Sequence, residues 1–430
     1  MDLHPATRLI GDRPPTLEEL DERLRAVAAA HPQSCRLQTI GRSRAGWPVD
    51  LLTVHGGPVD VLLLGAPHPD EPLGLATIEA LAPYVATRAE TRETFTWHFV
   101  PCTDPDGTAL NETWWAAWPP TMESYHRGLY RPAAADQPEW TFPTAHFTAP
   151  LPETRAMMTV IDTVRPRLLV SLHSGNWDHC HYMITPGEQH LVDVLTAAAN
   201  RGGLPVAAAP SDCAGLESPG TGVFVLPRPQ PAPPDAEWEP TGMSSAHYAA
   251  RHGGLGIFPE VPMWRTRPLT LPAEESIAVL DHARTLVSEA LARTLAADDG
   301  RESMFTAAVR DQVAIMAWMI GQVQQHPALA AEQPLTLTVP LRAAGMLLRH
   351  LRTRCTDEPG NRALHAEHDT LEGEFDAWCR RAQTALQPEP VPVAQAVTYQ
   401  ITTVLAAADL VARHVARPRA RTDVDLGISR

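Results

Sequence analysis

Three apolar stretches of the sequence are each followed by side chains that could bind a metal or move a proton. His68 and Glu71 come directly after the first stretch, and His173 comes after the second. Glu260 ends the third stretch. If these stretches are strands of an open α/β sheet, ligands bind just outside their carboxyl ends. We therefore expect the four side chains to meet, although they are far apart in the sequence.

Two histidines and one carboxylate form a typical catalytic zinc arrangement, which leaves one position for water. His68, Glu71 and His173 are the predicted ligands, and Glu260 is a further carboxylate that does not bind the metal. Zinc lowers the pKa of bound water to about 7, and a nearby glutamate can pass the released proton to a leaving amine. A single histidine after a strand is more often solvated or hydrogen-bonded, so the combination carries the prediction.

Strand and helix patterns alternate through the first 296 residues. The predicted strands cover 35–40, 49–54, 59–66, 94–101, 167–173, 181–185, 222–226 and 255–260, and the predicted helices cover about 17–27, 73–86, 154–164, 189–201 and 273–296. This alternation predicts an α/β domain with a mixed, mostly parallel sheet flanked by helices. Two long connections, 112–150 and 209–241, are predicted as loops.

The pattern changes near Asp298, after which only helical periodicity remains. Four amphipathic segments follow, at about 301–325, 340–354, 362–385 and 393–416. They predict an all-α helical bundle. We therefore expect two domains, a catalytic domain over 1–298 and a helical domain over 299–430. The helical domain could form a homo-oligomer, cap the active site or bind a peptide, although packing within the chain is the simplest expectation.

The composition excludes several classes of protein. The 430 residues include 35 basic side chains, all of them arginine, and 50 acidic ones, giving a net charge of −15. Without lysine there is no Schiff-base chemistry and no Walker-type phosphate loop. The acidic balance argues against nucleic-acid binding, and no apolar run approaches the roughly 18 residues of a membrane span. Six scattered cysteines and no secretory signal favour a cytoplasmic protein with reduced thiols.

Several segments resemble, in the same order, motifs of the zinc carboxypeptidase family, the carboxypeptidase A-like metallopeptidases. The segments are the strand–turn–strand at 40–49, the H-x-x-E motif at 65–71, the turn at 101–107, the third-ligand segment at 172–174 and the general-base segment at 258–262. The resemblance covers about the first 295 residues. It implies a carboxypeptidase-like fold in which His68, Glu71 and His173 bind zinc and Glu260 is the general base.

The sequence departs from this family where the family holds the carboxylate of its substrate. An Asn-Arg pair is expected there, but residues 136–143 contain no arginine, and Glu139 and Trp140 stand in its place. This loss puts carboxylate recognition in doubt. The position of Asp70 is often arginine in this family. A negative charge there would suit a neutral or cationic group of the substrate better than a carboxylate.

The remaining site predictions concern two arginines in the same loop. Arg127 or Arg131 could polarise the scissile carbonyl; we prefer Arg127 as a catalytic residue and place Arg131 in substrate binding, together with Asp70, Glu139 and Trp140.

The predicted function is a zinc-dependent hydrolase of peptide or amide bonds, in which a zinc-activated water attacks with Glu260 as general base. The substrate would be a peptide or an acyl-amide. Two alternatives remain open: a small-molecule deacylase or amidase of the related zinc deacylase type, and a zinc-binding protein without catalytic activity.

Overall fold

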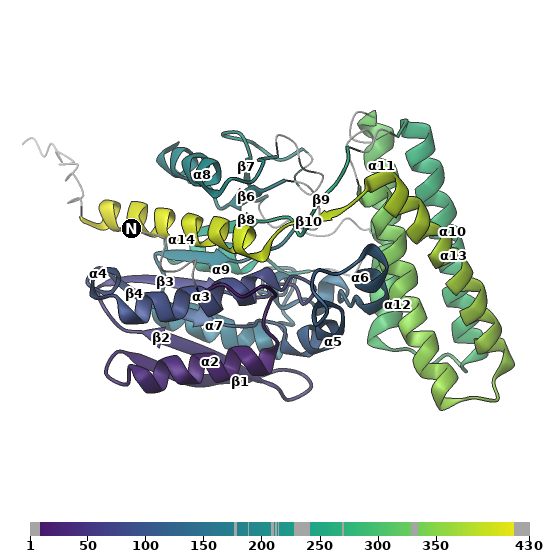
Figure 1. The fold of residues 1–430 in the computed structure, drawn as a ribbon, viewed down its shortest axis with the longest axis horizontal. Helices are drawn as coiled ribbons and strands as arrows, with labels where there is room; N and C mark the ends of the chain where they lie inside the picture. Colours follow the sequence, from purple (N-terminus) through teal and green to yellow (C-terminus); the bar gives the residue numbers. More distant parts are fainter. Residues whose placement is uncertain are drawn as a thin grey trace, which may run out of the picture.

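The computed structural model describes residues 9–175, 179–187, 189–207, 210, 213, 215–227, 241–268, 271–327 and 334–416. An α/β body carries a bundle of long helices at one end (Figure 1). Much of the predicted loop 209–241, including most of its proline cluster, and the tail after residue 416 lie outside the described residues.

A sheet of eight strands forms the centre of the body. The strands are β1 (Cys35–Arg42), β2 (Pro48–Val54), β3 (Val59–Leu64), β4 (Phe95–Val100), β5 (Leu168–Ser171), β6 (His181–Ile184), β7 (Val223–Val225) and β8 (Leu255–Glu260). Across the sheet they follow the order β1-β2-β4-β3-β5-β8-β6-β7. The pairs β3–β4, β3–β5, β5–β8 and β6–β7 are parallel, and the other neighbours are antiparallel. The predicted mixed, mostly parallel sheet is confirmed.

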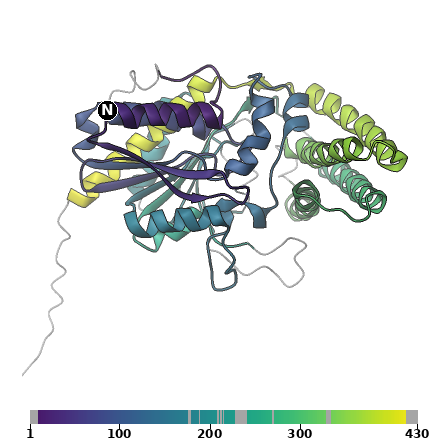
Figure 2. The same cartoon turned by 90° about the horizontal axis from the view of Figure 1, so that it is seen from below.

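The central strands are apolar on both sides because helices cover both faces of the sheet. In β3 every residue except Asp60 is buried, as is typical of a parallel strand inside an α/β sheet. One face is covered by α2 (Leu17–Ala30), α3 (Leu73–Thr87), α8 (Gln189–Gly202) and α14 (Val393–Ala416), and the other by α7 (Pro152–Val164) and α9 (Ser245–Ala250). Figure 2 shows α2 and α14 on the same side of the sheet.

A capping box marks the start of α2. The Thr16 side chain accepts from the Glu19 N–H, and the Glu19 side chain accepts from the Thr16 N–H.

Four long helices form the bundle. They are α10 (Ala273–Ala297), α11 (Met304–Gln325), α12 (Leu335–Asp357) and α13 (Arg362–Leu386). Their shared core includes Leu280, Val309, Leu347 and Phe375. The chain passes from β8 to the bundle through the short strand β9 (Trp264–Arg265) and returns through β10 (Glu389–Pro390), which pairs with β9. The bundle is thus inserted between β8 and α14.

The packing groups the helices differently from the domain boundary predicted at residue 298. α10, predicted to close the catalytic domain, packs in the bundle, and α14, predicted to belong to the helical domain, packs on the sheet. Val397, Ile401 and Val404 of α14 are fully buried in the same cluster as β3 and α3. Helical periodicity shows that a helix has an apolar face, but not which surface covers that face.

The predicted loop 112–150 contains more regular structure than expected. It holds the end of α5 (Pro105–Trp115), α6 (Met122–Gly128) and two short 3-10 turns, η1 (Ala134–Asp136) and η2 (Pro138–Trp140). A further short helix, α4 (Ala89–Arg92), precedes β4. Prolines interrupt the region 112–150, and because proline has the lowest helix propensity, the sequence pattern there did not indicate short helices.

Candidate metal centre

The two histidines and the carboxylate predicted as ligands lie together in the structure. One ligand atom of each of His68, Glu71 and His173 lies within 4.8 Å of the others, and all three side chains are buried. His68 and Glu71 follow β3 and His173 follows β5, which pairs with β3 in parallel. Adjacent parallel strands end at the same edge of the sheet, which is why residues about one hundred positions apart meet.

The ring of His173 is oriented by two side chains behind it. Ser171 donates its hydroxyl proton to Glu139 Oε2 at 3.2 Å, so its oxygen accepts from His173 Nε2, also at 3.2 Å. The other ring nitrogen, Nδ1, faces Glu71, whose Oε2 lies 3.2 Å away. The bond to Ser171 is the kind of outer contact that fixes the tautomer of a metal-binding histidine.

The electrostatics of the cluster suit a cation. Burial alone would lower the pKa of His173, but the carboxylates of Glu260 and Glu71 outweigh it and raise that pKa to about 9. Burial lowers the pKa of His68 well below its usual value, and its Nδ1 has no hydrogen-bond partner among the described residues. A buried imidazole nitrogen without a partner, beside two carboxylates that attract positive charge, fits a metal ligand set.

Glu260 lies beside the predicted ligands, at the end of β8. Its Oε1 is 3.5 Å from His173 Nδ1, and the side chain is 8% exposed. Across the strand pair, His181 of β6 stands directly opposite Glu260. Both ring nitrogens of His181 are buried without hydrogen-bond partners in the described parts of the chain. His181 therefore lies next to the predicted general base.

Arg131 reaches the metal cluster, but it is already paired. Its Nη1 donates to Asp70 Oδ1 at 3.0 Å and to Glu71 Oε1 at 2.8 Å. Asp70 is fully buried and also accepts from the Tyr125 hydroxyl. The expectation that Asp70 presents a negative charge to the substrate is therefore wrong: Arg131 and Tyr125 bind that carboxylate, which lies in the protein interior.

Arg127 does not occupy the position predicted for it. Its guanidinium donates to Glu123, Glu372 and Asp376 at 2.8, 2.5 and 2.6 Å, and it lies over the ring of Phe375. These contacts join α6 to α13 of the bundle. A guanidinium bound by three carboxylates is not available to polarise a carbonyl, so we withdraw Arg127 as a catalytic residue.

Glu139 and Trp140 take different positions around the cluster. Glu139 is fully buried and accepts from Ser171 and from the backbone and hydroxyl of Ser245. It therefore supports His173 from behind instead of contacting a substrate, contrary to its predicted role. Trp140 is half-buried, and its ring centroid lies 6.1 Å from that of His68.

The bundle contributes an arginine that sequence reasoning missed. Arg342 lies on the face of α12 that meets α6 and the segment after it. One turn further on, Met346 Sδ accepts from the Arg131 N–H at 3.5 Å, and Arg349 donates to the Gly128 carbonyl. The Nε of Arg342 is buried, and no described residue accepts a hydrogen bond from it. No local signal distinguishes this arginine from the others of α12.

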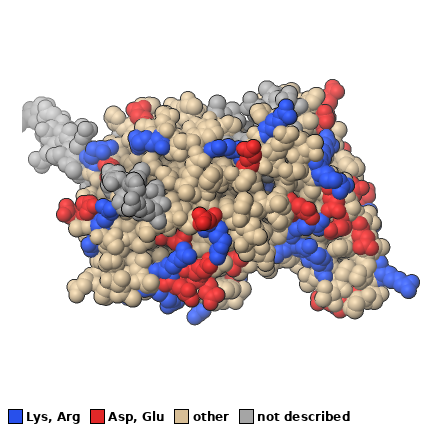
Figure 3. Space-filling view, viewed as in Figure 1, with Lys and Arg blue, Asp and Glu red and all other residues tan. Residues whose placement is uncertain are grey.

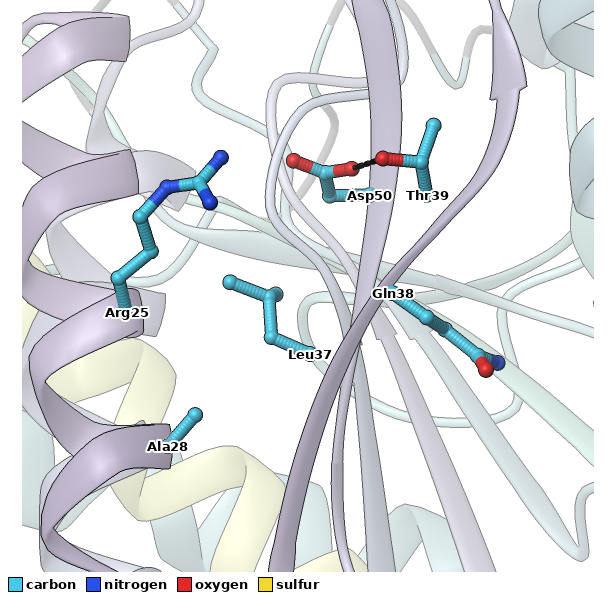
Figure 4. A pocket seen from close by; sticks show the side chains of 6 residues that line it. All are labelled: Arg25, Ala28, Leu37, Gln38, Thr39 and Asp50. Atoms are coloured by element: carbon cyan, nitrogen blue, oxygen red, sulfur yellow. Dashed lines mark hydrogen bonds between the residues drawn. The ribbon is translucent and has the colours of Figure 1, made fainter. Parts of the chain in front are cut away.

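One surface pocket of the described residues lies away from the metal cluster. The pocket in Figure 4 lies between α2 and β1–β2 and is lined by Arg25, Ala28, Leu37, Gln38, Thr39 and Asp50. Its two charged side chains are hydrogen-bonded to Asp21 and Thr39 respectively, and it contains no metal-ligand cluster. On the face shown in Figure 3 acidic and basic side chains are interspersed. Among the described residues, no helix is long and apolar enough to cross a membrane.

Three adjacent strand ends of the α/β sheet present two histidines and two carboxylates, a set of side chains that could hold a metal ion. Residues 20–183, which contain all three predicted ligands, match the family described as zinc carboxypeptidase. The resemblance seen in the motifs is thereby confirmed for this part of the chain, and it supports a metallohydrolase. No curated protein matches the sequence significantly.

Solved metallocarboxypeptidases are similar to this chain at low identity. The metallo-carboxypeptidase from Burkholderia cenocepacia is 18% identical with a TM-score of 0.39, over 58% of this chain and 60% of that one, which is less than two thirds of its length. The carboxypeptidase A from Helicoverpa armigera is 15% identical with a TM-score of 0.39, over 74% of each chain.

Proposed function

We propose that this protein is a zinc-dependent hydrolase of peptide or amide bonds. The observation that carries the proposal is the convergence of His68, Glu71 and His173 within 4.8 Å, with the carboxylate of Glu260 3.5 Å from His173 Nδ1. Two histidines and one carboxylate leave a zinc position for water, and the match to zinc carboxypeptidases over residues 20–183 supports this chemistry.

The residues around the cluster have separate roles in this proposal. A bound zinc ion would activate water and polarise the carbonyl of the substrate. Glu260 accepts the proton of the attacking water at its carboxylate and delivers it to the departing nitrogen. Arg131 fixes Glu71 through an ion pair, and Glu139 fixes the ring of His173 through Ser171. The half-buried Trp140 forms an apolar wall next to His68.

Arg342 supports a substrate that carries a carboxylate near the scissile bond. Arg342 is half-buried, and its buried Nε has no hydrogen-bond acceptor among the described residues, which costs free energy. The site acids Asp70 and Glu71 are bonded to Arg131, which leaves Arg342 without a carboxylate from them. A substrate carboxylate would supply the partner for Arg342 and could accept a two-pronged hydrogen bond from it. The family's carboxylate-binding arginine would then be replaced by one from the inserted bundle.

The test combines metal analysis with the variant Glu260→Gln. The wild-type protein is expected to bind one zinc ion per chain and to hydrolyse N-acylated dipeptides with a free carboxylate. Glu260→Gln keeps the shape of the side chain but cannot accept the proton, so we expect full zinc content and a loss of at least a hundredfold in kcat/KM.

Each alternative gives a different result in the same assays. Cleavage of small N-acyl amides without any cleavage of peptides would indicate a deacylase or amidase. Stoichiometric zinc without turnover of any substrate would indicate a binding protein. An active Glu260→Gln variant would contradict the role given to Glu260.

A further inference from the structure

Gln400 is a polar residue in the middle of an apolar helix face. It lies on α14 between Val397 and Val404, both fully buried, and its own side chain is also fully buried. A buried amide must have its hydrogen bonds satisfied, since an unpaired one costs more than the hydrogen bond itself contributes. Its partners therefore indicate what the residue holds in place.

All three partners of Gln400 belong to segments that carry the metal cluster. Its Nε2 donates to the carbonyl of His173 at 2.8 Å and to that of Pro259 at 3.5 Å. Its Oε1 accepts from the Thr77 hydroxyl at 2.6 Å. His173 is a predicted ligand, and Pro259 directly precedes Glu260. Thr77 lies in the first turns of α3, the helix that begins just after Glu71.

The contact with His173 holds backbone that the sheet alone does not fix. β5 ends at Ser171, so the carbonyl of His173 lies beyond the strand and its ladder. The bond from Gln400 anchors that carbonyl to α14 and, through the same amide group, to the backbone before Glu260. The carbonyls of His173 and Pro259 fix the orientation of the amide, because a carbonyl can only accept, which leaves the amide oxygen to accept from the Thr77 hydroxyl.

We infer that Gln400 is a positioning residue of the metal centre, setting His173 and Glu260 relative to α3 and Glu71. The inference rests on the proposed function in that the cluster binds zinc. α14 follows the inserted bundle in the sequence, so a helix more than two hundred residues after His173 takes part in building the centre. Substitution of residues that orient metal ligands typically weakens metal binding tenfold to a hundredfold.

A second buried hydrogen bond on the same helix provides a matched control. Thr403, one turn after Gln400, is fully buried and bonded to the Tyr182 hydroxyl at 3.0 Å. Tyr182 lies in β6 and is neither a predicted ligand nor adjacent to one. Thr403→Val therefore removes a buried polar contact between α14 and the sheet without touching the segments that carry the centre.

The experiment measures the zinc dissociation constant by chelator competition for the full-length wild type, Gln400→Met, Thr77→Val and Thr403→Val. We expect Gln400→Met to weaken zinc binding about tenfold or more, and Thr77→Val to weaken it in the same direction by less. Thr403→Val should lower thermal stability but leave zinc binding unchanged. With Co²⁺ as the metal, the visible absorption spectrum should change for Gln400→Met and not for Thr403→Val.

The outcomes separate this inference from the proposed function. If the wild type binds zinc and Gln400→Met binds it equally well with an unchanged Co²⁺ spectrum, the positioning role is wrong and the proposed function stands. If Gln400→Met does not fold, Thr77→Val decides in its place, and unchanged zinc binding in that variant overturns the inference. A wild type that binds no zinc overturns both.

Discussion

Asp104 is a carboxylate that the fold buries at the start of a helix. It is the N-cap of α5, where its Oδ1 accepts from the Gly107 N–H at 2.9 Å. Its Oδ2 is buried and has no hydrogen-bond partner within the described residues. Burial raises the pKa of Asp104 to about 7, although the Gly107 bond and the charge of Arg44 act in the opposite direction. The ionised form is therefore destabilised in the folded protein.

This predicts a variant whose benefit depends on pH. Because the pKa of Asp104 is raised in the folded state, this carboxyl group lowers the unfolding free energy of the wild type. The loss is absent below the unfolded-state pKa near 4, grows as the pH rises to about 7 and is constant above that. Asp104→Asn keeps the N-cap acceptor and cannot ionise. The gain in unfolding free energy of Asp104→Asn over the wild type should be about 3 kcal/mol larger at pH 8 than at pH 5.

Urea unfolding at the two pH values measures this difference directly. The control is Asp281→Asn on α10, where the aspartate side chain is 56% exposed. This variant should change the unfolding free energy equally at pH 5 and pH 8. An Asp104→Asn gain that is the same at pH 5 and pH 8 would show that the buried carboxylate carries no ionisation penalty.

At the scale of the elements, the metal centre depends on three adjacent strands and on the helix α14, which packs on one face of the sheet. β3, β5 and β8 lie next to one another, so their carboxyl ends deliver His68, His173 and Glu260 to one place. The helix α14 packs against α3 and α8 on the face of the sheet below that place. It belongs to the α/β body although the whole bundle precedes it in the chain.

This packing predicts that a chain ending at residue 298 does not fold into a stable α/β unit. Such a chain lacks α14, and each fully buried Val, Ile or Leu side chain contributes about 1.5–3 kcal/mol. Val397, Ile401, Val404 and their buried neighbours together exceed the 5–15 kcal/mol by which a typical domain is stable. We expect an aggregated or unfolded product by circular dichroism.

A chain ending at residue 416 keeps every described helix and is the control. It should unfold cooperatively and near the melting temperature of the full-length protein. A cooperatively folded 1–298 fragment would instead support the domain boundary predicted from the sequence.

At the scale of the whole molecule, the bundle is an insertion whose two connections run side by side. β9 and β10 pair through Trp264 with Pro390 and Arg265 with Glu389, so the chain leaves and rejoins the body at one point. Further contacts join the bundle to α6, where Arg127 binds Glu372 and Asp376. This arrangement, visible in Figure 1, holds α12 against α6 and against Arg131 in the segment after it.

The bundle should therefore influence which substrates the centre accepts. If Arg342 binds a substrate carboxylate, Arg342→Gln should raise KM for free-carboxylate substrates about tenfold or more, because hydrogen bonds to charged groups contribute about 1.5–3 kcal/mol. The same variant should leave the corresponding amidated substrates nearly unaffected. Steady-state kinetics on both substrates, together with binding of N-acetylglycine and its amide, measure the effect.

Arg352→Gln is the matched control, since this exposed arginine lies on the same helix and carries the same charge. It should change neither KM nor the binding of N-acetylglycine. Equal losses for amidated and free-carboxylate substrates in Arg342→Gln would indicate a structural role for Arg342 in place of carboxylate binding.

The sequence by itself determined the strands, most helices and the identity of the candidate metal ligands. Buried strands such as β3 are recognisable in the sequence because a strand covered on both faces is a nearly continuous apolar run. His68, Glu71 and His173 could be predicted to meet because parallel strands deliver their carboxyl ends to one edge of the sheet. These inferences depend on local pattern and on a general rule of topology, both of which a single sequence contains.

Only the tertiary structure decided which charges and helices act together. Arg131 pairs with Asp70 and Glu71 while Arg127, four residues earlier, binds carboxylates of the bundle. The two arginines are equivalent in sequence, and their roles differ because ion pairs form wherever distant surfaces meet. The same reason applies to α10 and α14, since an amphipathic helix specifies an apolar face but not the partner that covers it.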